Sequence, residues 1–567
     1  MTSNEKESKN IKDKYVKLDP IEHVLRRPNM YVGSIEEDEY TTWIFDDKLK
    51  KMKKIKLKYV PGFYKIYDEL IVNVLDHMKR IQMSKSKTKN IVKTIKINID
   101  IEENKIEVYN DGDGIDVEVH PEHKVYIPEL IFGNMLTSTN YDENEEKVIG
   151  GMNGIGAKAC NIFSKKFILE TVDSNKKLKY RQEFEDNMGK KNKPEIVKFE
   201  KYPFTKITFY PDLEKFNLKK ITNQMYKLMQ KRVYDICALT NDTTKVFFND
   251  EELNIKNFQK YAELYFNDVL PKDIIYEKIN DRWEVIVSYN ENSGLEQVSF
   301  VNGIWTLKGG KHVDYIVNQI SKNIIDLIQK KNKDLQVKPQ HIRDNLFVMI
   351  KSTIVNPAFD SQTKETLTTS VSKFGSKGEL SKQYYNKLYN SKLTENVIEL
   401  SEMYMNKSLK KTDGKKKTQI KGIPKLDDAI WAGTGKSEQC TLILTEGDSA
   451  KSMAIAGLSV VGREKYGVFP LRGKLLNVLD TADSKIASNE EITNIKKIMG
   501  LETKKKYKDL KSLRYGKIMI MTDQDVDGSH IKGLLFNLFN TMWPSLIKID
   551  GFMNSMLTPI IKAKKKM

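Results

Sequence analysis

Three aspartates at alternate positions are the residues of this sequence that most directly indicate chemistry. Asp523, Asp525 and Asp527 follow a short apolar run over 518–521 and precede a glycine. Carboxylates this close repel one another at neutral pH unless a cation neutralises them. A strand that ends in carboxylates and turns into a helix is typical of a site at the carboxyl edge of an α/β sheet. The pattern therefore predicts a divalent metal site, with Mg²⁺ as the expected ion.

The same residues match the first half of an EF-hand calcium loop. The twelfth position of such a loop is a bidentate glutamate, but here it is Leu534, and a predicted strand rather than a helix comes before. A second apolar run, over 441–445, leads directly into Glu446 and a glycine. Two adjacent strands of this kind would converge Glu446 on Asp523 and Asp525, as metal-assisted phosphoryl transfer requires.

Residues in the N-terminal half could bind and hydrolyse a nucleotide. The segment from Pro61 to Arg80 has helical composition, and Glu69 and Asn73 lie on one polar stripe of it. Considered alone, this pattern is typical of an amphipathic surface helix. Alternating isoleucines then predict a β-hairpin over 95–108, followed by the glycine-containing loop that begins at Asn110. Asn110 offers the donor and the acceptor that recognition of an adenine edge needs.

Two further segments could hold phosphates. Residues 136–140 supply hydroxyl groups, and the glycine-rich stretch from Gly150 to Lys158 leads into a predicted helix. Backbone amides of such a loop, together with its lysine, can cradle a phosphate chain. The spacing is not that of a Walker A loop.

Composition restricts the class of protein. The 567 residues allow roughly four domains, and the 39% hydrophobic content is ordinary for packed cores. A net charge of +18 indicates a polyanionic partner, and nucleic acid is favoured over a membrane because no long apolar span occurs. The three isolated cysteines predict neither a disulfide framework nor a zinc site. An intracellular protein is expected.

Three motifs in order, LTEGDSAK, VFPLRGKLLNV and MTDQDVDGSHIKGLL, resemble type IIA DNA topoisomerases of the eukaryotic and large-DNA-virus kind, and the two acidic strands resemble a TOPRIM fold. The N-terminal motifs resemble the Bergerat (GHKL) ATPase fold. The resemblance implies an α+β and α/β multidomain protein: a GHKL ATPase domain, a ribosomal-S5-like transducer domain and a Rossmann-like TOPRIM domain. It implies ATP and Mg²⁺ as ligands.

The resemblance also assigns roles. Glu69 would be the general base, Asn73 the ligand of the ATP magnesium, and Lys364 of a QTK-like loop would reach the γ-phosphate, while Glu446 would act in cleavage. The expected ATP-binding residues are Asn73, Arg80, Asn110, Ser138, Thr139, Asn140, Gly151, Met152, Asn153, Gly154, Ile155, Gly156, Ala157, Lys158, Gln362, Thr363 and Lys364. The expected metal ligands are Glu446, Asp523, Asp525 and Asp527. His77 and Asp113 depart from the residues usual in the family.

The expected domains are a flexible arm at 1–14, the ATPase at 15–243, the transducer at 244–405, a linker at 406–436 and an incomplete TOPRIM domain at 437–567. Lys330 and Lys331, in a basic loop, are expected to contact DNA, although a solvated helix end is an equally good interpretation. Lys474 and Asn477 resemble the family's DNA-contacting segment.

The function expected is that of an ATP-dependent type II DNA topoisomerase, acting as a homodimer on double-stranded DNA, in the nucleus or at a viral replication site. The family's cleavage tyrosine lies on a winged-helix domain after TOPRIM, and no tyrosine here can be given that role. The chain is expected to be a fragment, or the separate subunit of a split topoisomerase. The alternative from another class is a MutL-like ATP-driven DNA clamp, against which the second metal site argues.

Overall fold

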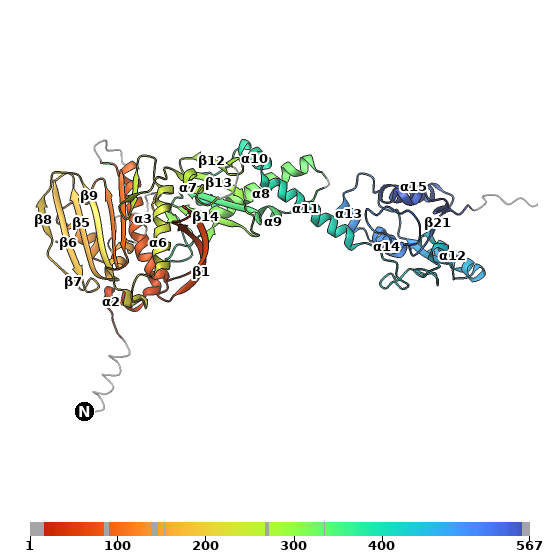
Figure 1. The fold of residues 1–567 in the computed structure, drawn as a ribbon, viewed down its shortest axis with the longest axis horizontal. Coiled ribbons are helices and arrows are strands. Elements are labelled where there is room, and N and C mark those ends of the chain that lie inside the picture. The colour runs from red at the N-terminus through yellow and green to blue at the C-terminus, as the bar shows by residue number, and fades with distance from the viewer. Residues whose placement is uncertain are drawn as a thin grey trace, which may run out of the picture. The chain divides into compact units, whose positions relative to one another are not determined.

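The computed structural model describes residues 16–83, 90–135, 137, 146–151, 154–266, 271–333 and 335–557. The chain forms two compact units (Figure 1). The first contains the chain up to Ser321 and again from Arg343 to Leu393, and the second contains Lys322–Ile342 and the chain from Thr394 onward. Each unit encloses a hydrophobic core of its own.

A nine-stranded sheet dominates the first unit. Its order is β11-β10-β3-β4-β9-β5-β6-β7, with β8 paired to β6, and only the β10–β3 pair is parallel. The strands are β3 (Thr94–Asp100), β4 (Lys105–Asp111), β5 (Ser164–Asp173), β6 (Leu178–Glu185), β7 (Lys190–Lys191), β8 (Glu195–Lys198), β9 (Phe204–Pro211), β10 (Lys245–Phe248) and β11 (Glu251–Glu252). The predicted hairpin is confirmed, because β3 and β4 pair with Ile99 opposite Ile106.

Helices cover one face of this sheet. They are α2 (Pro20–Arg26), α3 (Pro61–Met83), α4 (Ile127–Gly133), α5 (Gly156–Ile162) and α6 (Asn223–Leu239). The short helix α7 (Phe258–Ala262) packs instead against the five-stranded sheet described next. The predicted helix from Pro61 is α3, which packs against α5 and α6. The surface-helix interpretation of this segment is wrong, because Glu69 and Asp76 on its polar stripe are buried together with the apolar residues.

A five-stranded sheet forms the rest of the first unit, in the order β12-β13-β17-β14-β15. Its strands are β12 (Ile275–Asn280), β13 (Trp283–Tyr289), β14 (Glu296–Val301), β15 (Ile304–Trp305) and β17 (Leu346–Ser352). Smaller elements are the hairpin of β1 (Asp38–Asp46) and β2 (Lys51–Tyr59), the pair of β16 (Gly309–Gly310) and β18 (Thr366–Leu367), and the helices α9 (Pro339–Arg343) and α10 (Lys382–Tyr389).

The strand around Val246, where the transducer domain is expected to begin, does not belong to this second sheet. It is β10, which pairs parallel to β3 at the edge of the first sheet and buries Val246 and Phe248 in the core beside α3. The five-stranded sheet begins only at β12. Short apolar strands carry no local mark of the sheet they join, because their pairing partner is distant in the chain.

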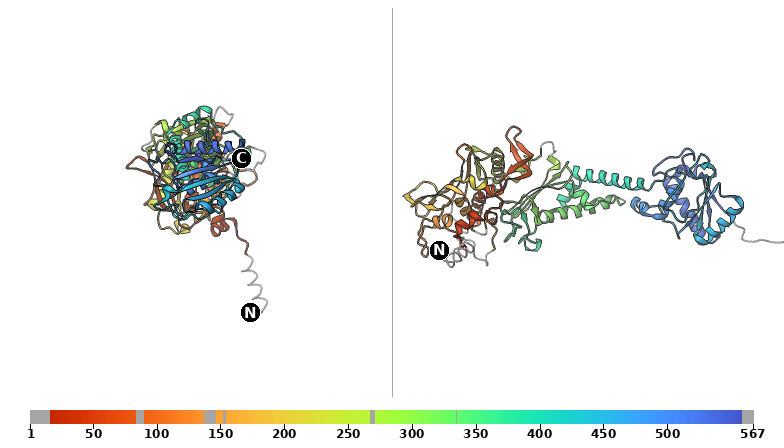
Figure 2. Two further views of the ribbon diagram at one scale, coloured as in Figure 1. Left: turned by 90° about the vertical axis from the view of Figure 1, so that its right-hand side faces the viewer. Right: turned by 90° about the horizontal axis from the view of Figure 1, so that it is seen from below.

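The second unit contains a parallel sheet in the order β20-β19-β21-β22. Its strands are β19 (Thr441–Glu446), β20 (Tyr466–Leu471), β21 (Lys517–Met521) and β22 (Met553–Ser555), and its helices are α12 (Gly447–Val461), α13 (Asp483–Ser488), α14 (Glu490–Met499), α15 (Val526–Met542) and α16 (Pro544–Ile547). Leu442 of β19 lies in one hydrophobic cluster with residues of α15, and the next residue, Ile443, lies in another with residues of α12. The two helices therefore cover opposite faces of this sheet (Figure 1 and Figure 2).

Much of the predicted linker is structured. The helix α11 (Lys392–Lys411) includes the first residues of the predicted linker. In the same way, Lys330 and Lys331, predicted to lie in a basic loop, are the last residues of the helix α8 (Lys311–Lys331). Farther on, Asp427 forms a backbone bridge to Val468 of β20, and the Asp428 carboxylate accepts hydrogen bonds from Arg514 and Tyr515. The segment thus belongs to the second unit rather than to a solvated connection.

Candidate functional site

A cavity of about 720 Å³ opens in the first unit beside α3. This volume lies within the usual range of sites for small molecules. Residues predicted from four separate segments line it together: Glu69, Asn73, Arg80, Asn110, Gly151, Gly154, Ile155, Gly156, Ala157, Lys158, Gln362 and Lys364. Their convergence brings the motifs of the nucleotide-binding prediction to one place.

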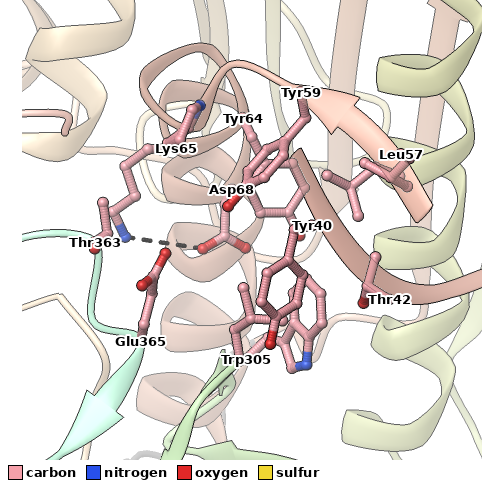
Figure 3. A pocket seen from close by; sticks show the side chains of 13 residues that line it. Tyr40, Thr42, Leu57, Tyr59, Tyr64, Lys65, Asp68, Trp305, Thr363 and Glu365 are labelled. Carbon is pink, nitrogen blue, oxygen red and sulfur yellow. Dashed lines mark ion pairs between the residues drawn. The ribbon is translucent and has the colours of Figure 1, made fainter. Parts of the chain in front are cut away.

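Six other predicted residues are not placed in this cavity. Ser138, Thr139, Asn140, Met152 and Asn153 lie outside the described residues. Thr363 lines a separate small cavity instead, beside Tyr40 and Glu365 (Figure 3). Its neighbours Gln362 and Lys364 line the large cavity, and a contact of Thr363 with the nucleotide stays a prediction.

Glu69 is buried between two cations and a glycine. Its Oε1 lies 2.6 Å from Nζ of Lys65, one turn earlier on α3, and 3.3 Å from Nζ of Lys364. Burial opposes its ionisation, but the ammonium groups of Lys364 and Lys65 outweigh burial and lower the pKa of Glu69 to about 2. A Cβ on Gly156 would come within 2.0 Å of Oε2. The carboxylate is therefore ionised and closely confined.

Asp76 holds the glycine-rich loop. Its two carboxylate oxygens accept hydrogen bonds of 2.7 Å from the amides of Gly150 and Gly151. Burial raises its pKa, although these amides act in the opposite direction. From the sequence, Asp76 or its neighbour His77 is expected on the polar stripe of this helix, with no role assigned. In the structure both residues line the cavity. No local signal marks a carboxylate that will meet amides more than seventy residues away.

Lys158 stabilises the same loop from inside. Its Nζ donates hydrogen bonds of 2.7 Å to the carbonyl oxygens of Thr137 and Gly154. Burial lowers the pKa of Lys158 to about 8. In this arrangement its charge is directed at backbone carbonyls of the loop.

The hairpin β3–β4 and the following loop form another wall of the cavity. Asn110 is the penultimate residue of β4 and lies between Ile95 of β3 and Thr205 of β9. Its Nδ2 donates a hydrogen bond to the Asp111 carbonyl at 2.9 Å. His120 and His123 also line the cavity and were not predicted; their rings lie 4.6 Å apart.

Asp113, a departure from the family's usual residue, serves the loop itself. Its Oδ1 accepts hydrogen bonds from Nδ2 of Asn90 at 2.8 Å and Oγ of Ser174 at 2.9 Å. It is not among the residues that line the cavity.

In the second unit, β19 and β21 run side by side and bring the backbone of Asp523 to the predicted carboxylate of Glu446. The Asp523 amide donates to Oε2 of Glu446 at 3.3 Å. Asp525 instead caps α15 by accepting from the Gly528 amide at 2.7 Å, and Asp527 pairs with Lys474 at 2.9 Å. Within the described ranges, no three Asp, Glu, His or Cys side chains are grouped closely enough to hold a metal ion. The three expected carboxylates are therefore not grouped in the part of the chain that the structure describes, and the metal site stays a prediction.

The residues expected to bind DNA fall in two places. Lys330 and Lys331 are exposed at the end of α8. Asn477 accepts hydrogen bonds from the Leu479 amide at 3.1 Å and from Nδ2 of Asn537 at 2.5 Å, near the Lys474–Asp527 pair in sequence. None of the helices that the structure describes is long and apolar enough to cross a membrane.

Comparison with known proteins places these features in a family. The family model "DNA gyrase B" matches residues 251–419, and the model "Toprim domain" matches residues 441–551. DNA topoisomerase 2 of Arabidopsis thaliana is 48% identical over 98% of this chain, and that of Acanthamoeba polyphaga mimivirus is 49% identical over 100% of it. The chain spans only 38% and 44% of the lengths of these relatives.

A solved structure extends the match to the fold. The crystal structure of the ATPase region of Saccharomyces cerevisiae topoisomerase II matches this chain with 44% sequence identity and a TM-score of 0.64. The match covers 69% of this chain and 100% of the yeast chain. The fold and the comparisons thus define a class of protein in which a region similar to the ATPase region of topoisomerase II is followed by a Toprim domain. The chain belongs to the DNA topoisomerase II family and comprises its ATPase and Toprim portion.

Proposed function

We propose that the first unit hydrolyses ATP, and that the chain is the ATPase and Toprim portion of an enzyme that passes one DNA duplex through another. The observation that carries this proposal is the confined, ionised Glu69 in a cavity that Asn73, Asn110 and Lys364 also line. An ionised carboxylate inside a nucleotide-sized cavity is what a general base for water requires.

In this proposal, Glu69 accepts a proton from the water that attacks the γ-phosphorus, while the bond to the β–γ bridging oxygen breaks and ADP leaves. Asn110 holds the adenine edge, and the amides of the glycine-rich loop hold phosphate oxygens. Lys364 exchanges its contact with Glu69 for one with the γ-phosphate. Asn73 supplies an oxygen ligand for Mg²⁺, which when bound neutralises charge on the triphosphate.

For the Toprim unit, we propose that Glu446 and Asp523 are the primary Mg²⁺ ligands. Glu446 ends β19, Asp523 follows the adjacent parallel strand β21, and the Asp523 amide donates to the Glu446 carboxylate. Asp525 and Asp527, also expected as ligands, are engaged by Gly528 and Lys474 in this structure. The four expected carboxylates, as they lie in this structure, therefore fit a metal ion only in part.

The proposed partners are a second copy of the chain, double-stranded DNA and a winged-helix cleavage domain that carries the catalytic tyrosine. ATP would close the gate between the two copies, and the site of action would be wherever the DNA lies, in a nucleus or at a viral replication site. A MutL-like clamp is less well supported, since it gives no account of the match to the Toprim model over residues 441–551.

The test is ATP turnover by the full chain, with and without duplex DNA, beside Glu69→Gln. We expect kcat to fall by at least about 100-fold in the variant, the usual contribution of a general base, while binding of a non-hydrolysable ATP analogue persists. Glu103→Gln is the matched control, because it removes an exposed carboxylate from the same unit. Wild-type turnover in Glu69→Gln would overturn the proposal.

A further inference from the structure

The proposed base has two cationic neighbours of different origin. Lys65 belongs to α3 itself, four residues before Glu69, whereas Lys364 comes from a loop almost three hundred residues later. Lys364 adopts a left-handed conformation with φ of 61° and also donates to the Gly150 carbonyl at 3.2 Å. Non-glycine residues rarely adopt this conformation without a local cause. The contact of Lys364 with Glu69 thus depends on the conformation of the loop, whereas that of Lys65 depends only on the helix.

Lys65 is fixed from its other side. Its side chain is 4% exposed, and its Nζ lies 3.8 Å from Oδ2 of Asp68. The other oxygen of Asp68 accepts a hydrogen bond of 2.5 Å from Nε of the fully buried Arg232 on α6. Arg232 also donates to the Gly303 carbonyl at 2.7 Å. A chain of buried charges therefore joins the base to α6 and to the turn between β14 and β15.

Figure 3 shows this side of Lys65. Lys65 and Asp68 lie on the wall of the small enclosed cavity, together with the rings of Tyr64 and Trp305. The cavity volume of about 40 Å³ has room for a water molecule or two but not for a ligand. Lys65 thus has no bulk solvent to compete with Glu69 and Asp68 for its ammonium group.

We propose that Lys65 is the resident positioning residue for Glu69: it keeps the carboxylate ionised and correctly oriented after Lys364 has moved to the triphosphate. This inference rests on the proposed role of Glu69 as the general base. Once Lys364 leaves, a buried Glu69 without Lys65 would be an uncompensated buried charge, and burial would favour its protonated form. A protonated Glu69 cannot accept the proton of the attacking water.

The charged surroundings of Glu69 limit what else could perform this task. Among the described residues, the cations paired with Glu69 are Lys65 of α3 and Lys364 of the loop, and α5 approaches the carboxylate at Gly156, where no side chain fits. Four more charged residues line the same cavity, namely Asp76, Arg80, Asp116 and Lys158, together with the titratable His77, His120 and His123. Asp76 is committed to the amides of the glycine-rich loop, and Lys158 to loop carbonyls.

The experiment measures kcat, KM for ATP and the pH dependence of kcat for the full chain, Lys65→Met and Lys65→Arg, with Glu69→Gln in parallel. In Lys65→Met we expect kcat to fall by about 10- to 100-fold, with KM within about threefold, because orientation rather than nucleotide binding is lost. The acid limb of the profile should move to higher pH by about one unit or more, because a cation that lowers the carboxyl pKa has gone. Lys65→Arg should keep the acid limb in place.

The outcomes separate the two proposals. Activity in Glu69→Gln defeats the proposed function itself. An inactive Glu69→Gln beside a Lys65→Met variant with an unshifted acid limb defeats only the role of Lys65. If Lys65→Met does not fold, as judged by thermal unfolding, Lys65→Gln takes its place; it retains a hydrogen-bond donor without the charge, and the same shift is expected. If kcat falls equally at every pH because less protein is folded, and the acid limb of the profile does not shift, Lys65 is merely structural and the inference is overturned.

Discussion

Asp76 illustrates how one carboxylate of α3 differs from others only seven or eight residues away. Burial raises its pKa, so its ionised form lowers the stability of the fold at neutral pH, and this loss disappears as the pH falls toward the ordinary carboxyl range. Its two accepted hydrogen bonds order Gly150 and Gly151. We therefore attribute to Asp76 a function in loop order rather than in stability.

For Asp76→Asn we predict weaker ATP binding without a large loss of stability. The amide group of asparagine would turn a donor toward one of the two glycine amides, and one unsatisfied buried group costs about 1–3 kcal/mol. That cost corresponds to a rise of roughly tenfold or more in KM for ATP. Titration with a non-hydrolysable ATP analogue and a thermal unfolding curve measure the two effects. The control is Asp113→Asn, which alters a loop carboxylate outside the cavity; equal KM values in the two variants would contradict the prediction.

At the level of helices, the approach of α5 to α3 confines the carboxylate of Glu69, the proposed base. The first residue of α5 is Gly156, and a side chain there would meet Oε2 of Glu69 at 2.0 Å. We predict that Gly156→Ala lowers kcat by about 100-fold, because displacing a base by about 1 Å has effects of this size. The flexible end of Glu69 can shift, so the fold should persist, as circular dichroism would verify.

A matched control for this variant is Gly457→Ala, in the middle of α12. Nothing lies within 4 Å of a Cβ added at Gly457, and alanine is favoured over glycine in a helix by about 1 kcal/mol. Turnover should be unchanged in this control. A Gly156→Ala variant that hydrolyses ATP as fast as the control would show that the close contact does not confine the base.

At the scale of the whole molecule, the net charge of +18 predicts DNA binding that weakens steeply with salt. If Lys330 and Lys331 each contact a phosphate, replacing both by alanine should reduce the slope of log K against log salt by about 1.8, at roughly 0.9 per contact. Fluorescence anisotropy of a labelled duplex over a salt series measures the slope. The control replaces Lys219 and Lys220, an exposed pair elsewhere in the chain, and an equal change there would assign the effect to net charge alone.

The sequence by itself determined the local elements and most of the nucleotide site. Alternating isoleucines defined β3 and β4 because a strand exposes one face and buries the other, and the motifs of α3, the Asn110 loop, the glycine-rich loop and the QTK-like loop named twelve residues that line one cavity. The strand signal is short-range, whereas most of the residues that line the cavity were assigned through the resemblance to the Bergerat ATPase and topoisomerase families.

Only the tertiary structure decided what depends on partners distant in the chain. It joined β10 to the first sheet, packed the predicted linker onto the second unit, and turned Asp525 to its helix cap. It also gave Lys65 and Asp76 their tasks, because burial and opposing charge arise only when separate elements meet. A lysine and an aspartate on a helix look alike in sequence whether they face water or a buried base, and the free energy of their ionisation is set by that environment.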